Sequence, residues 1–137
     1  MKICITTTSK NKNSNVDPRF GRSQYFLILN EKGEVEEAID NAAQNAQRGA
    51  GISAAQKLEN KDVEILITGN IGPNAFNALN AAKIKVFLVD PSLTAEKAFA
   101  KWKDNELDEI NKANVGGHFG RGGGPGRGRG KGWGPNN

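Results

Sequence analysis

The stretch of sequence that decides the fold is residues 63–89, VEILITGNIGPNAFNALNAAKIKVFLV. Two short apolar runs, at 63–68 and 84–89, are typical of buried strands. Between them Pro73 follows Gly72 and favours the start of a helix that continues to about Ala82, because proline suits the first helical position. A strand-helix-strand unit joins two parallel strands by a right-handed crossover. This stretch therefore predicts an α/β fold.

The flanking sequence extends this unit into a larger sheet. Runs at 24–30 and 34–40, separated by a turn at Lys32-Gly33, predict an antiparallel hairpin. The other predicted elements are a strand at 2–7, helices at 52–60 and 95–103, and a short last element near Leu107 and Ile110. The resulting order is strand-strand-strand-helix-strand-helix-strand-helix. It predicts a mixed central sheet with flanking helices.

Charge and glycine are concentrated in one segment of the chain. The 137 residues carry 19 Lys and Arg against 15 Asp and Glu, a formal net charge of +4. Residues 116–134 hold 11 of the 17 glycines and four basic residues without an acid, so the rest of the chain is neutral. Residues 116–137 also lack aliphatic side chains that could be buried on folding. We predict a globular α/β domain at 1–113 and a disordered cationic tail at 114–137.

Composition excludes several classes of protein. No apolar run is long enough for a membrane span, and the first ten residues, MKICITTTSK, do not resemble a secretory signal. A single cysteine fits a reducing compartment, so we expect a cytoplasmic protein. Cys4 and His118 are the only Cys and His, which excludes a four-ligand Cys/His zinc site in one chain. Nothing in the sequence indicates an oligomeric state.

Two arginines in the long polar segment at 9–22 are candidate anion ligands. Arg19 and Arg22 flank Phe20-Gly21, and each guanidinium offers a planar fork of donors to an anion. The alternative is that these arginines tie the segment to a carboxylate such as Asp17.

Two glycine-containing turns are also candidate anion-binding sites. Gly49 and Gly51 precede one predicted helix, and Gly72 and Asn74 lie at the start of the next. Backbone N–H groups at helix starts bind anions, and open α/β sheets place ligands beyond the carboxyl ends of their strands. The alternative is that these glycines only form tight turns.

Four motifs in order resemble the dinitrogenase iron-molybdenum cofactor biosynthesis family. The motifs are Arg19-Phe20-Gly21-Arg22, Tyr25-Phe26, Gly49-Ala50-Gly51-Ile52 and Gly72-Pro73-Asn74-Ala75-Phe76. The resemblance implies a ribonuclease-H-like α/β fold. It also implies binding, carriage or storage of iron-sulfur or iron-molybdenum cluster precursors, without catalysis. Nuclease activity is not expected, because the first strand ends in Thr6-Thr7-Thr8 instead of a metal-binding acid.

Cys4 and His118 are the candidate metal ligands. Many family members place His or Cys just before the Gly-x-Gly of the central loop, whereas residues 44–48 here are QNAQR. Cys4 lies within a predicted strand, where a free cysteine either packs as a small apolar side chain or ligates metal. His118 lies in the tail, as a mobile ligand or a solvated residue.

The tail offers a second way to hold an anion. Its basic residues are Arg121, Arg127, Arg129 and Lys131. These charges could hold an anionic iron-sulfide cluster. Arginine also contacts phosphates and stacks on bases, so nucleic-acid binding through the Arg-Gly repeats is the alternative function. The remaining possibilities are a solubilising tail and a scaffold whose partner docks on the tail.

Overall fold

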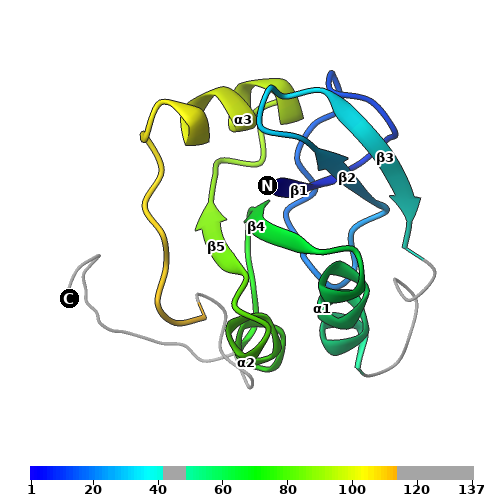
Figure 1. The fold of residues 1–137 in the computed structure, drawn as a ribbon, viewed down its shortest axis with the longest axis vertical. Helices are drawn as coiled ribbons and strands as arrows, with labels where there is room; N and C mark the ends of the chain where they lie inside the picture. Colours follow the sequence, from blue (N-terminus) through cyan, green and yellow to red (C-terminus); the bar gives the residue numbers. More distant parts are fainter. Residues whose placement is uncertain (42–48, 114–137) are drawn as a thin grey trace.

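The computed structural model describes residues 1–41 and 49–113, which form one mixed sheet with helices on both faces (Figure 1). The strands are β1 (Lys2–Thr7), β2 (Tyr25–Leu29), β3 (Val35–Asp40), β4 (Val63–Thr68) and β5 (Lys85–Leu88). The helices are α1 (Ala50–Asn60), α2 (Pro73–Ala81) and α3 (Ala95–Lys103). None of the described helices is long and apolar enough to cross a membrane.

The order of strands across the sheet is β3-β2-β1-β4-β5. β1 is antiparallel to β2 and parallel to β4. β3 is antiparallel to β2, and β5 is parallel to β4. This arrangement confirms the predicted element order and the mixed α/β sheet. The predicted tail at 114–137 lies outside the described residues.

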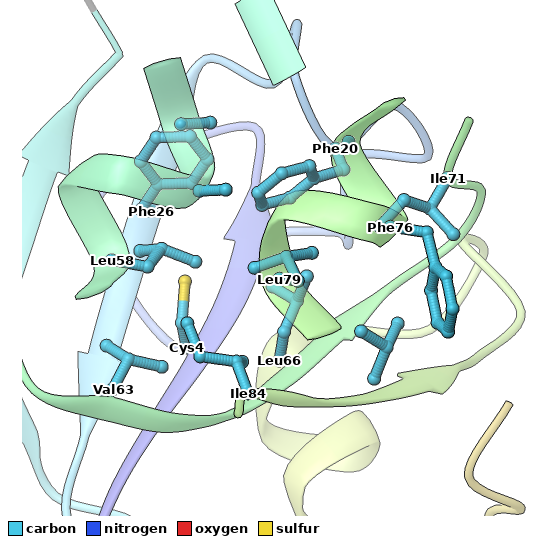
Figure 2. Packing of buried hydrophobic residues seen from close by; sticks show 14 of the residues in the cluster. Cys4, Phe20, Phe26, Leu58, Val63, Leu66, Ile71, Phe76, Leu79 and Ile84 are labelled. Carbon is cyan, nitrogen blue, oxygen red and sulfur yellow. The ribbon is translucent and has the colours of Figure 1, made fainter. Parts of the chain in front are cut away.

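Strand alternation divides the core into two apolar layers. Cys4 contributes to the layer beneath α1 and α2, whereas its neighbours Ile3 and Ile5 contribute to the layer beneath α3. Figure 2 shows the first layer, in which Cys4 lies among apolar side chains including Leu58. Successive strand residues point to opposite faces of the sheet, so β1 contributes side chains to both layers.

The last predicted element, near Leu107 and Ile110, is neither a helix nor a full strand in the structure. Glu109 makes an isolated bridge with Phe87, and the Ile110 N–H donates to the carbonyl of Val86 at 2.9 Å. The segment therefore covers part of the outer edge of β5, and its apolar side chains pack on the core from there.

Helices α1 and α2 approach closely at their first turns. A Cβ built on Gly51 would lie 2.7 Å from the Cβ of Ala75, a separation that real side chains do not tolerate. A Cβ on Gly72, which precedes α2 with φ −86°, would meet no atom within 4 Å. The glycine at position 51 is therefore required by helix packing, whereas the one at position 72 is not.

We predict that Gly51→Ala lowers the free energy of unfolding by about 1–3 kcal/mol, because the helices must separate to admit the methyl group. Gly72→Ala is the matched control and should cost about 1 kcal/mol or less, the loss of a modest N-cap preference. Urea denaturation of the two full-length variants measures both values. Equal losses would contradict the close packing of Gly51 on Ala75.

Candidate functional site

Three segments that are distant in sequence meet at the carboxyl ends of β1 and β4. The loop after β1 crosses the turn after β4, where the Phe20 N–H donates to the carbonyl of Asn70 at 3.3 Å. A Cβ on Gly69 would lie 2.8 Å from the Cα of Pro18. A Cβ on Gly21 would lie 2.7 Å from the Cα of Gly51 at the start of α1. The structure thus brings together the arginine loop and both glycine turns, and we call this region the rim.

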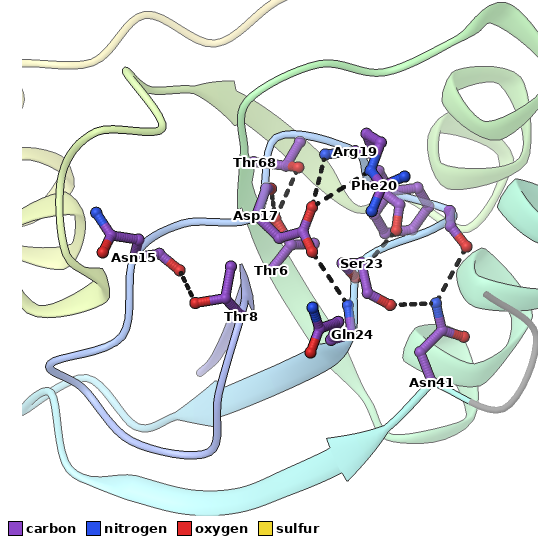
Figure 3. Close-up of polar contacts among 11 residues, drawn as sticks. Thr6, Thr8, Asn15, Asp17, Arg19, Phe20, Ser23, Gln24, Asn41 and Thr68 are labelled. Carbon is purple, nitrogen blue, oxygen red and sulfur yellow. Dashed lines mark hydrogen bonds and ion pairs between the residues drawn. The ribbon is translucent and has the colours of Figure 1, made fainter.

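The buried carboxylate of Asp17 organises the rim (Figure 3). Its two oxygens accept backbone N–H groups from Arg19 and Gln24, each at 3.2 Å. Its own backbone N–H donates to the carbonyl of Thr6 at 2.8 Å, and its carbonyl accepts the Thr6 hydroxyl at 2.7 Å. Asp17 therefore fastens the loop to the end of β1. Sequence reasoning used Asp17 with Pro18 as a loop signal and as a possible ion-pair partner, but did not predict that its carboxylate fastens the loop.

Asn41 is a second organising residue that sequence reasoning missed. It is buried, and its side-chain amide donates to the carbonyls of Gly21 at 3.0 Å and Ser23 at 2.8 Å. These bonds hold the end of the loop against the end of β3. Nothing local in the sequence marks Asn41, because its partners lie about twenty positions earlier.

Arg19 fits both interpretations considered for it, an anion ligand and an ion-pair partner of Asp17. Its Nε lies 3.7 Å from an oxygen of Asp17, so the ion pair exists, yet 62% of its side chain is exposed. Most of the guanidinium is therefore accessible at the rim. Arg22 is half-buried, and its backbone N–H donates to the Arg19 carbonyl at 3.3 Å, which closes the turn.

The starts of α1 and α2 lie side by side at the rim. Gly49 precedes α1 with φ +78°, a left-handed conformation that favours glycine, and Gly72 precedes α2. No side chain among residues 1–41 and 49–113 caps either helix start, and neither first turn contains an acid. Asn74 is exposed in the first turn of α2. Helix starts carry partial positive charge, so the rim is suited to an anion.

Of the two candidate metal ligands, Cys4 does not join this arrangement. Cys4 is fully buried in the apolar layer, and burial raises the pKa of its thiol above the ordinary value, so the thiol stays protonated at neutral pH. This placement favours packing over ligation, since thiolate is the ligating form. No group of three His, Cys, Asp or Glu side chains suited to a metal occurs in the part of the chain that the structure describes. His118 and the basic residues Arg121, Arg127, Arg129 and Lys131 lie outside it.

We predict that Cys4 reacts with iodoacetamide at least about 100-fold more slowly in the native protein than in urea, because alkylation requires an accessible thiolate. Mass spectrometry of labelled protein gives both rates. Rapid labelling of the native protein would show that the thiol reaches solvent and would restore Cys4 as a candidate ligand.

Comparison with known proteins identifies the family. The family model described as dinitrogenase iron-molybdenum cofactor matches residues 1–105, and the chain belongs to this family. An uncharacterized protein of Methanocaldococcus jannaschii is 36% identical over 78 residues, which cover 55% of this chain and 66% of that relative, just under two thirds of its length.

Two solved structures share both fold and sequence similarity. The apo form of the orange protein from Desulfovibrio gigas superimposes with a TM-score of 0.79 at 36% identity, covering 82% of this chain and 95% of the other. A putative NifB protein from Thermotoga gives a TM-score of 0.69 at 36% identity, covering 79% of this chain and 91% of the other. These similarities confirm the family resemblance drawn from the four motifs.

Proposed function

We propose that the chain binds and carries an anionic iron-sulfur or iron-molybdenum cluster precursor at the rim and catalyses no reaction. One observation carries the proposal: two helix starts without side-chain caps or first-turn acids meet the loop that carries the exposed side chain of Arg19. Membership of the dinitrogenase iron-molybdenum cofactor family supports a metal-cluster cargo. The similarity to the orange protein, whose structure is of an apo form, supports reversible binding of the cargo.

The chemistry of the rim suits reversible binding. Cluster sulfides carry negative charge and accept hydrogen bonds, which backbone N–H groups and a guanidinium can donate. Soft metals otherwise bind thiolates, but the thiol of Cys4 is buried. A cargo held by charge and hydrogen bonds is released without breaking a metal–thiolate bond. This property fits a carrier.

We predict that Arg19→Gln weakens binding of a cluster, reconstituted anaerobically from iron and sulfide, by about tenfold, the loss of one charged hydrogen bond. Titration of the charge-transfer absorbance gives the dissociation constant, and iron and acid-labile sulfide analysis gives the composition.

Lys32→Gln is the matched control for this experiment. Lys32 is an exposed base in the turn between β2 and β3, at the opposite end of the sheet from the rim. It should leave binding unchanged. Equal weakening by both variants would show that only net charge matters and would reject the rim as the site.

The tail adds positive charge in this proposal. We predict that replacing its four basic residues with glutamine lowers the iron retained after anaerobic gel filtration. The substituted positions are Arg121, Arg127, Arg129 and Lys131. Unchanged iron content would remove the tail from cargo binding. If the native chain instead binds RNA with a salt dependence that the variant lacks, the Arg-Gly repeats serve the alternative nucleic-acid function.

A further inference from the structure

A cavity of about 280 Å³ lies between α3 and the turn that joins β2 to β3. The apolar part of its lining comes from Leu29 at the end of β2 and from Phe99 and Ala100 on α3. Leu29 is fully buried, Phe99 is half-buried and Ala100 is exposed, so this apolar surface runs from the core to the solvent. The volume is at the lower end of the roughly 300–1,000 Å³ of small-molecule sites. The cavity therefore suits a small molecule.

Hydrogen bonds fix the two walls of the cavity. In the turn, the Asn30 side chain accepts the backbone N–H of Lys32 at 2.9 Å. The Lys103 ammonium at the end of α3 donates to the carbonyl of Glu31 at 2.7 Å and so joins the helix to the turn. Because these bonds exist before any ligand arrives, the walls need little ordering on binding, which lowers its cost.

The charged part of the lining has a surplus of positive charge. It consists of the bases Lys12, Lys32 and Lys103 and the acids Glu96 and Asp104. None of these side chains forms an ion pair within the part of the chain that the structure describes. Lys12 is half-buried, so water screens its ammonium less than one on the open surface, which strengthens its attraction for an anion. One carboxylate on a ligand neutralises the surplus.

We infer that this cavity binds a small carboxylate that carries an apolar body. The apolar body packs on Leu29 and Phe99 and leaves water, which drives binding. The carboxylate accepts hydrogen bonds from the lysines, and Lys103 has three N–H groups, enough to serve the ligand and Glu31 together. Leu29 pairs with Ile3 at the start of β1, whereas the rim lies at the other end of that strand. The site is therefore separate from the proposed cluster site and does not depend on it.

Titration of the full-length protein with phenylacetate tests the site. In ¹H–¹⁵N NMR spectra, the backbone amides of Gly33 and Phe99 beside the cavity should shift saturably. Phenylacetamide, a neutral molecule of the same shape, should bind about threefold more weakly, the effect of one partly exposed charge contact. Acetate keeps the charge without the ring and should bind about tenfold more weakly. The inference is overturned if these amides do not shift, or if phenylacetate binds no more tightly than both other molecules.

A pair of variants tests the contribution of the lysines. Lys12→Gln removes one base from the cavity and should weaken phenylacetate binding about threefold. Lys97→Gln is the matched control, because Lys97 is an exposed base on α3 that does not line the cavity. It should leave binding unchanged. Equal weakening by the two variants would show attraction to net charge alone and reject the cavity as the site, as would unchanged binding in both.

Discussion

The buried carboxylate of Asp17 is the constraint on which the rim depends. A carboxylate removed from water is costly unless hydrogen bonds replace its hydration. Here backbone N–H groups from Arg19 and Gln24 do so, while the main chain of Asp17 is bonded to Thr6 on β1. The loop therefore has one favourable placement, and it carries the buried ring of Phe20 beneath it. The exposed guanidinium of Arg19 is positioned as a consequence.

Much of the fold could be predicted because apolar alternation marks strands directly. The bounds of β1, β4 and α3 match the predicted 2–7, 63–68 and 95–103 to the residue. α1 begins at Ala50, two residues before the predicted start, because the left-handed Gly49 ends the preceding loop earlier. The conformation of the segment near Ile110 was harder to predict, because it depends on a contact with the outer edge of β5 and not on the segment's own apolar pattern.

The site was predictable in its location but not in its internal roles. Strand direction alone places both glycine turns at one end of the sheet. The separate reasons for each glycine depend on contacts across the chain: Gly49 has a positive φ, Gly51 packs on Ala75, and Gly72 faces open space. Likewise, the bonds from Asn41 to the arginine loop join residues whose pairing no local pattern signals.

The two edges of the sheet are treated differently, and this asymmetry limits how the protein can associate. The segment at Glu109 and Ile110 occupies part of the outer side of β5, while β3 has a neighbour on one side only among residues 1–41 and 49–113. Head-to-tail growth of a stack of sheets needs a free strand at both edges of every copy, so even partial cover of β5 works against it. The asymmetry therefore disfavours fibre growth through the sheet edges.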